Sequence, residues 1–205
     1  MNKSALKVGV DVPWVTSWTE ETVLGVRPCA TVGGRAALVQ TGAAGFGKPL
    51  YSQNHLVRQR QTVLGMLCPM CGEPTSSDDR WTQVAQQTSA GRLRREGKAM
   101  NLDRALEDRR VVIDAGSIAP LHRRCVDRSL RYCPHLKADP NVNVMPFPAK
   151  WTVLPLMIEA TAPMEAGVAV AAIAVITFLQ LIGVTDRVDR NWRFRKPVRR
   201  THRSG

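Results

Sequence analysis

The sequence is poor in aromatic residues, has no apolar segment at its N-terminus and contains no internal repeat. Aromatic residues make up only 5% of the 205 residues, whereas apolar residues make up 44%, which is ordinary for a globular protein and argues against a disordered chain. The first residues, Met-Asn-Lys-Ser-Ala-Leu-Lys, do not form the apolar core of a signal peptide, so we expect no export. Five cysteines without an export signal favour reduced thiols or metal ligands over disulfides, which indicates a cytoplasmic protein.

Two enzyme motifs are nearly present, and each lacks a residue that its chemistry requires. Residues 42–48 match a glycine-rich phosphate loop, but Pro49 stands where a Ser or Thr would bind magnesium and where a backbone N–H would bind phosphate. A His-Asn-His nuclease needs a general-base histidine on the strand before its metal-binding helix, and residues 111–116, Val-Val-Ile-Asp-Ala-Gly, contain none. We therefore expect a protein that is not an enzyme.

Four residues in two close pairs have the chemistry and the spacing of a zinc site. Cys68 and Cys71 are separated by two residues and followed by a glycine, which suits a tight turn that brings both sulfurs to one ion. His122 and Cys125 are three positions apart, so they lie on one face if they form the first turn of a helix. Four protein ligands leave no open position for a reacting water, and we therefore expect a structural Zn²⁺ in a treble-clef-like arrangement.

Three further residues compete with this ligand set or lie outside it. Cys133 and His135 follow the same expected helix, and they could replace His122, bind a second ion or pack within the fold. Cys29 has no potential ligand close to it in the sequence, and we expect it in the core.

The hydrophobic pattern predicts a small, irregular, zinc-stabilised α+β domain. In a helix expected over residues 55–66, Arg58 and Arg60 should point outward, away from the apolar side chains. The other expected elements are a strand after a turn at Gly33-Gly34, a helix from 122 to about 132, strands at 111–113 and 151–158, and a partly helical insertion at 76–110.

The longest uncharged segment, residues 166–184, has nearly the length needed to cross a bilayer. Its flanks do not favour a span, because either the basic C-terminal tail or all of residues 1–165 would have to be translocated. A central helix that is packed on all sides has the same apolar composition. We therefore expect one central hydrophobic helix here, and a membrane-associated protein anchored by 166–184 is the alternative.

Composition divides the chain into an α+β domain with the zinc site (1–140), a segment with a linker, a strand and the hydrophobic helix (141–185), and a basic tail (186–205). The formal net charge is +12, and the tail alone carries eight basic and two acidic side chains, which gives +6. Such a tail is either a solvated arm or a contact for a polyanion. The candidate contact residues in the tail are Trp192, Arg193, Arg195, Lys196, Arg199 and Arg200, where the tryptophan could stack on a base, and Arg92, Arg94, Arg95 and Lys98 add basic surface elsewhere.

Several motifs resemble those of a group of small bacterial and phage-type zinc-binding proteins. The shared motifs are C-x2-C at 68–71, H-x2-C at 122–125 and C-P-H-L at 133–136, and the resemblance extends over residues 48–136. It implies a soluble zinc protein of bacterial or phage origin, in which Cys133 and His135 belong to a specified part of the structure. It implies no particular activity.

These features together predict a non-enzymatic binding protein in which zinc holds a small scaffold. Its expected partner is a nucleic acid or an acidic protein that is contacted through basic surface. A phage-type effector that binds and inhibits a host protein is the alternative within the same class of binding proteins.

Overall fold

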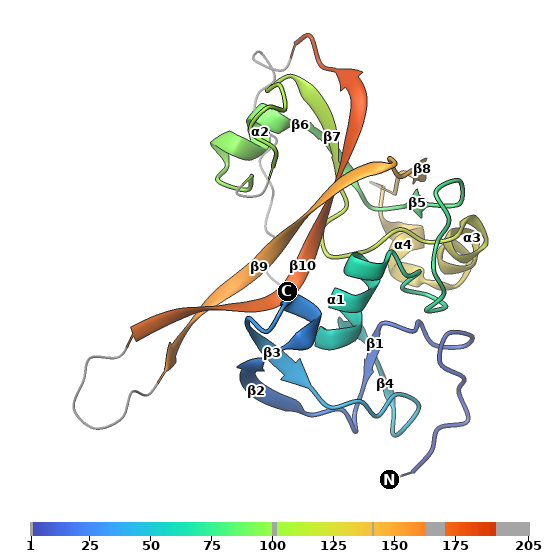
Figure 1. The fold of residues 1–205 in the computed structure, drawn as a ribbon. Helices are drawn as coiled ribbons and strands as arrows, with labels where there is room; N and C mark the ends of the chain where they lie inside the picture. The colour runs from blue at the N-terminus through green and yellow to red at the C-terminus, as the bar shows by residue number, and fades with distance from the viewer. Residues whose placement is uncertain (1, 100–101, 141, 163–170, 192–205) are drawn as a thin grey trace.

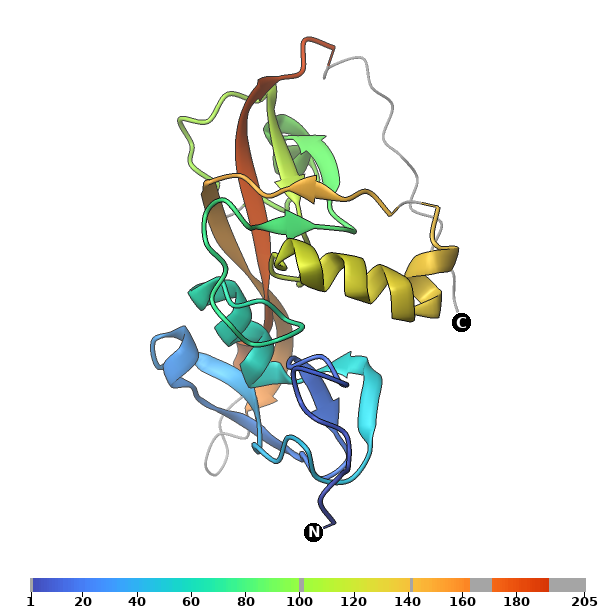
Figure 2. The ribbon, with the colours of Figure 1, turned by 90° about the vertical axis from the view of Figure 1, so that its right-hand side faces the viewer.

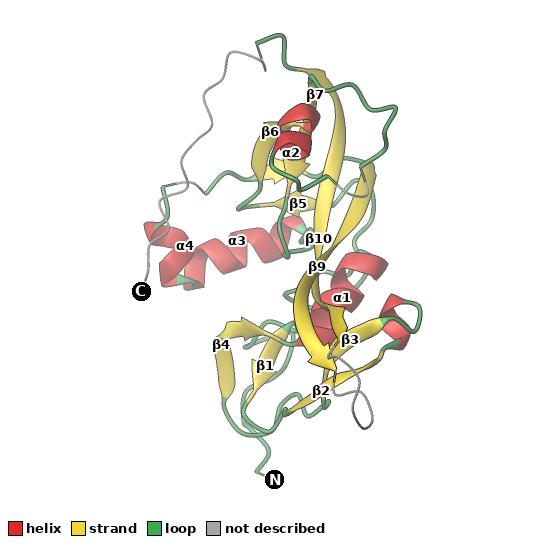
Figure 3. Ribbon diagram, turned by 90° about the vertical axis from the view of Figure 1, so that its left-hand side faces the viewer, coloured by secondary structure: helices red, strands yellow, loops and turns green. Residues whose placement is uncertain are grey.

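The computed structural model describes residues 2–99, 102–140, 142–162 and 171–191, which form a mixed helix and sheet structure (Figures 1 and 3). The expected α+β class is confirmed. The helices are α1 (Leu56–Gly65), α2 (Ala90–Arg95), α3 (Arg123–Tyr132) and α4 (Pro134–Ala138), with a 3-10 turn at Ala30–Val32. The strands are β1 (Thr16–Trp18), β2 (Val23–Pro28), β3 (Ala36–Gln40), β4 (Pro49–Asn54), β5 (Trp81–Thr82), β6 (Gln86–Ser89), β7 (Arg110–Asp114), β8 (Met145–Pro146), β9 (Lys150–Ala162) and β10 (Ala171–Val188).

Strand β10 is the centre of the main sheet. One edge of β10 pairs antiparallel with the whole of β9. The other edge pairs antiparallel with β7 toward its C-terminal end and parallel with β3 at Ile176 and Ala37, and β6 and β2 extend these two branches. Two smaller sheets, β1 with β4 and β5 with β8, lie beside the main sheet.

The expectation of a central hydrophobic helix at 166–184 is wrong for the described part of that segment. Residues 171–184 belong to β10, and residues 166–170 lie outside the described residues. Val175, Ile176 and Leu181 are at most 1% exposed. A strand that is covered on both faces is apolar along its length, so hydrophobic periodicity does not distinguish it from a buried helix. The many valines and isoleucines of residues 171–184 favour the strand. Among the described residues, no helix is long and apolar enough to cross a membrane.

Helix α1 confirms the helix expected at 55–66 and buries Leu56 and Val63, but Arg58 and Arg60 lie inside the protein instead of pointing outward. Arg58 and Arg60 are 7% and 0% exposed, whereas Leu64 is 45% exposed. His55 caps the helix, because its Nδ1 accepts a hydrogen bond from the Arg58 N–H at 3.2 Å. The helix therefore places several polar side chains inside the protein together with Leu56 and Val63.

The buried polar side chains of α1 bind the edge of β10 in the gap between β3 and β7. The Gln59 amide donates to the Leu179 carbonyl at 2.7 Å and accepts from the Leu179 N–H at 3.0 Å. Arg60 donates to the Thr177 carbonyl at 2.7 Å and to the Leu38 carbonyl on β3 at 2.8 Å. These side chains take the place of a neighbouring strand, because buried backbone groups need hydrogen-bond partners.

Arg58, another buried polar residue of α1, forms an ion pair with Glu21, which is 6% exposed. The two side chains make two hydrogen bonds, of 2.6 and 2.9 Å. Burial acts to raise the pKa of Glu21, but hydrogen bonds from Arg58 and from the Ala43 N–H outweigh it, so the pKa is lowered. Burial lowers the pKa of the neighbouring His55, although its hydrogen bond to the Thr41 carbonyl opposes the shift.

The remaining elements agree with the sequence in type but not always in extent. The expected strands at 111–113 and 151–158 and the expected helix from 122 to 132 correspond to β7, β9 and α3. The turn at Gly33-Gly34 leads into β3 as expected. The insertion at 76–110 contains two short strands and α2. The division into three regions stays a prediction.

Candidate metal centre and the basic helix beside it

The first pair of expected metal ligands lies on a tight turn. The Gly72 N–H donates to the Cys68 carbonyl at 2.8 Å, and the Cys68 N–H donates to the Glu73 carbonyl at 2.8 Å, so the chain reverses around the two cysteines. Gly72 has a φ of +83°, and a Cβ at this position would lie 2.8 Å from the Trp14 indole. Both the backbone conformation and the space available therefore require glycine after Cys71.

The N-terminal segment packs against this turn. The Trp14 N–H donates to the Met70 carbonyl at 2.9 Å, and the Val15 N–H donates to the Pro69 carbonyl at 3.0 Å. The two residues between the cysteines are thus held by backbone hydrogen bonds to a segment more than fifty positions earlier in the sequence. This contact fixes the orientation of the turn, because it uses the carbonyl groups that the turn leaves unpaired.

The second pair lies at the start of α3. His122 is the N-cap residue and makes no capping hydrogen bond with its side chain, and Cys125 lies in the first turn, where its N–H donates to the His122 carbonyl at 2.9 Å. The Asp79 carboxylate accepts from the Arg123 N–H at 2.7 Å and caps the helix instead. The His122 side chain is therefore left for another role.

The two pairs come together as one cluster of four possible metal ligands. One ligand atom from each of Cys68, Cys71, His122 and Cys125 lies within 4.8 Å of the other three. The Cys71 sulfur is 3.4 Å from Nδ1 of His122, and Nε2 of the same ring contacts the Pro74 carbonyl at 3.1 Å. Because the carbonyl can only accept, it places the ring proton on Nε2, and Nδ1 faces the thiols with a free lone pair.

Two thiols of the cluster, Cys68 and Cys125, resist ionisation in the absence of a cation. Burial raises the pKa of Cys68, although hydrogen bonds from the backbone amides of Cys71, His122 and Met70 oppose the rise. Burial, together with the adjacent thiols of Cys68 and Cys71, raises the pKa of Cys125 to about 12. Three thiols this close lose their protons together only if a positive charge compensates them, as a bound metal ion does.

The structure brings His122, and not His135, together with the three cysteines. Within the described residues, Cys133 and His135 are not part of the cluster. Cys29 is 7% exposed in the main core, as expected. Burial acts to raise its pKa, but hydrogen bonds from Thr31 and the nearby Arg60 guanidinium outweigh it, so the pKa is lowered.

Of the two basic surfaces expected from the sequence, the structure describes the one at residues 92–98, and the prediction for the tail stays untested. The tail residues Trp192, Arg193, Arg195, Lys196, Arg199 and Arg200 lie outside the described residues. Within residues 92–98, Arg92 and Lys98 both form ion pairs with Glu96, and Arg94 forms one with Asp108. Two carboxylates therefore compensate about half of the positive charge of the four basic side chains in this group.

Helix α3 carries a row of arginines that the sequence reasoning missed. Arg124, Arg128 and Arg131 are spaced i, i+4 and i+7, so they lie on one face, and none of them forms an ion pair with a described acidic side chain. We call these three residues the basic stripe. Figure 2 shows α3 running along the surface of the molecule next to α4. The spacing of the stripe is visible in the sequence and could have been found there.

The surroundings of the basic stripe are also positive. Residues 122–138 contain five basic side chains and one acidic side chain, Asp127, which gives a net charge of +4 with neutral histidines. Asp127 is already paired with Arg123 at 3.1 Å. Tyr132 at the end of α3 is 71% exposed and lies 5.8 Å from the Arg131 guanidinium. This end of the molecule thus combines cations with an accessible aromatic ring.

No family model, curated protein or solved structure matches this chain. The resemblance to the bacterial and phage-type zinc proteins therefore stays a prediction, and the function is argued from the site alone.

Proposed function

We propose that this protein is a non-enzymatic, zinc-stabilised nucleic-acid-binding protein that contacts its ligand through α3. The observation that carries the proposal is the basic stripe, Arg124, Arg128 and Arg131, on a helix whose first turn contributes two residues to the Cys/His cluster. In this proposal the metal positions the helix, and the helix binds the polyanion.

The chemistry of the cluster supports zinc as the metal. Three thiolates and one imidazole nitrogen are a common ligand set for structural zinc. With zinc–sulfur distances of about 2.3 Å, tetrahedral ligand atoms are about 3.8 Å apart, and the four atoms need only a small contraction from their present limit of 4.8 Å. The order of a cysteine turn, a strand (β7) and a helix whose first turn supplies the last ligands supports the treble-clef-like arrangement.

Zinc would also act favourably on α3 through its charge. A Zn²⁺ ion with three thiolates carries a net charge of −1, and this charge would lie at the N-terminus of α3, where the helix dipole is positive. His122 and Cys125 would be fixed relative to the cysteine turn. The metal would therefore stabilise the first turn of α3, next to the basic stripe, beyond what the packing of this ten-residue helix provides.

The geometry of the stripe favours a nucleic acid over an acidic protein. Seven helical positions rise by about 10 Å, which is comparable to the width of the major groove, about 12 Å. Arginine binds phosphate through two parallel hydrogen bonds, and the exposed Tyr132 could stack on an unpaired base or lie against the edge of a groove. The basic tail at 186–205 would add further phosphate contacts.

The test is the salt dependence of binding to a short fluorescent DNA duplex and to the matching single strand. We expect the wild-type affinity to fall steeply with salt. Replacing the stripe (R124Q/R128Q/R131Q) should lower the slope of log K against log salt by up to about 2.7 for a duplex, because three phosphate contacts are lost. The matched control, K3Q/K7Q/K48Q, removes the same charge from exposed lysines far from α3 in the sequence, and it should leave most of the slope in place.

Two results would contradict the proposal. The first is a wild-type affinity for both probes that does not change with salt. The second is an equal loss of binding in the stripe variant and the lysine control, which would mean that only the net charge matters. If the protein binds neither DNA probe but binds a polyaspartate peptide through the same stripe, its partner is an acidic protein. This result would also overturn the assignment to nucleic acid.

A further inference from the structure

The far half of the β9–β10 ribbon leaves the body of the protein. Figure 1 shows the two paired strands extending past the rest of the fold at the lower left. We call residues 157–162 of β9 and 171–174 of β10 the β arm. Met157 and Ile158 are 38% and 46% exposed, and Ala174 is also exposed. Glu159 is the one charged residue among the ten residues of the arm. A two-stranded ribbon with apolar side chains in water is marginally stable by itself, so this arm needs a partner.

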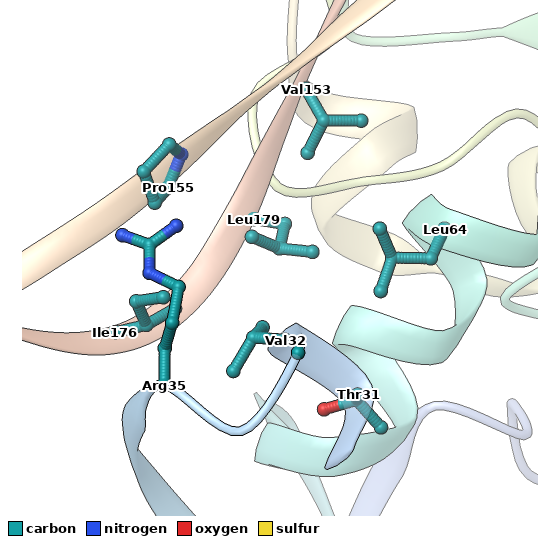
Figure 4. A pocket seen from close by; sticks show the side chains of 9 residues that line it. Thr31, Val32, Arg35, Leu64, Val153, Pro155, Ile176 and Leu179 are labelled. Atoms are coloured by element: carbon teal, nitrogen blue, oxygen red, sulfur yellow. The ribbon is translucent and has the colours of Figure 1, made fainter. Parts of the chain in front are cut away.

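A hollow of about 290 Å³ lies at the base of the β arm, between the ribbon, α1 and the 3-10 turn (Figure 4). Its walls are mostly apolar and include the exposed Leu64, and its one charged side chain is Arg35. Arg35 is exposed and forms no ion pair with a described acidic residue. In Figure 4 its guanidinium group lies near Pro155. The remaining lining residues are Thr31, Val32, Gly33, Val153, Ile176 and Leu179.

The hollow and the β arm lie on one face of the ribbon. Alternate residues of a strand point to the same side, so Met157 and Glu159 share the face of Val153 and Pro155, which line the hollow. The pairing register agrees, because Ile176, another lining residue, is opposite Met157 on β10. The face therefore runs from an apolar hollow with the Arg35 cation to an apolar arm with the Glu159 anion, and neither forms an ion pair with another described residue.

We propose that the partner of this face is a second copy of the same chain, bound so that the arms of the two copies lie antiparallel. Each Glu159 then pairs with the partner subunit's Arg35, and the apolar side chains between them cover each other. Pro155, beside Arg35, and Glu159 are four positions apart, or about 13 Å along the strand, and Met157 lies midway. A twofold axis at Met157 places each Glu159 next to the partner subunit's Arg35. The same ion pair therefore forms twice, as a symmetric dimer requires.

The composition of the face favours a second copy over another partner. An unrelated acidic or basic partner would match one charge of the face and oppose the other. A second copy, turned by the twofold axis, matches both charges with no further residue. The exposed Leu64 at the rim of the hollow would also be covered, which accounts for an apolar side chain on the outer side of α1.

The test is the mass of the full-length protein in solution, measured by sedimentation equilibrium at submillimolar concentration. We expect a dimer for the wild type. The single charge reversals R35E and E159R should each weaken dimerisation at least tenfold, because two ion pairs become two repulsive pairs, and the double variant R35E/E159R should restore the dissociation constant to within about threefold. Met157→Asp should give a monomer, whereas Ile158→Asp, one position along on the opposite face, should stay a dimer.

Each possible outcome has a defined meaning. A monomeric wild type overturns the proposal. If the double variant dimerises no more tightly than the single variants, Arg35 and Glu159 do not pair across the dimer. If Met157→Asp and Ile158→Asp weaken dimerisation equally, the interface is not on the face of β9 that carries Met157. If the two charges pair within one chain, the reversals change the thermal unfolding of the protein but not its mass, and the proposal fails. Circular dichroism of each variant shows that the fold is kept.

Discussion

Replacing Gln59 by methionine should be among the most damaging single changes in this protein that leave the metal cluster intact. Gln59 is 0% exposed and makes three hydrogen bonds to backbone groups, two to Leu179 and one to the Ser117 carbonyl at 2.8 Å. Methionine has nearly the same shape and volume, so it adds no cavity, but it leaves two carbonyls and one N–H without a partner.

The magnitude follows from those three groups. A buried polar backbone group that loses its partner costs about 1–3 kcal/mol, and some relaxation of the β10 edge is expected, so we expect the free energy of unfolding to fall by about 3 kcal/mol. The matched control is Gln61→Met, on the same helix and exposed, which should change the free energy of unfolding by less than about 0.5 kcal/mol.

Urea unfolding of the metal-saturated protein measures both values, because the midpoint falls while the slope stays unchanged if the native fold is kept. A Gln59→Met variant as stable as the Gln61→Met control would refute the idea that side chains of α1 replace a strand at the edge of β10. A changed slope would instead show that the sheet has opened in the native state.

Three further predictions concern the metal and pH. Cys125→Ala should lose the metal and lower Tm by more than about 10 °C, whereas Cys133→Ala should keep both, as metal analysis and calorimetry would show. Metal affinity, measured by competition with a chelator, should rise at least about a hundredfold per pH unit near neutrality, because the pKa values of Cys68 and Cys125 are raised and each of these thiols must release a proton. An affinity independent of pH contradicts this. The pKa of Glu21 is lowered in the folded protein, so its ionised carboxylate stabilises the fold at pH values above the ordinary pKa of a glutamate. This contribution is lost as the pH falls through the lowered pKa. The free energy of unfolding should therefore decrease less in acid for Glu21→Gln than for the wild type.

The parts of the structure that the sequence predicted correctly depend on local spacing. The C-x2-C and H-x2-C pairs place their ligands through one turn and one helical turn, so the cluster could be found without knowing the fold. The helices at 55–66 and 122–132 likewise follow from patterns within a dozen residues. The choice of His122 over His135 needed the structure, because it depends on where the Pro74 carbonyl and the cysteine turn meet the start of α3.

The errors arise where distant parts of the chain decide the outcome. Arg58 and Arg60 were expected outside because arginine is usually exposed, but Glu21 and the open edge of β10 supply partners that no local pattern reveals. The sequence predicts a helix at 171–184, because a strand covered on both faces lacks the alternation of polar and apolar residues that would identify it as a strand. Their pairing with β9, β7 and β3 decides the conformation, and pairing between distant segments is not encoded in periodicity.

The contact between the N-terminal segment and the cysteine turn has a consequence for the order of folding. Cys71 and His122 are 51 positions apart, and a bond between them through a metal would remove about 4 kcal/mol of loop entropy from the unfolded chain. The turn also holds Trp14 and Val15 by backbone hydrogen bonds, so the metal would tie together three segments that are made at different times during synthesis. Trp14 and Val15 would therefore be held more firmly once α3 has been synthesised and metal has bound to the turn that they contact. Their resistance to an aminopeptidase should report, from the opposite end of the sequence, whether the metal is present.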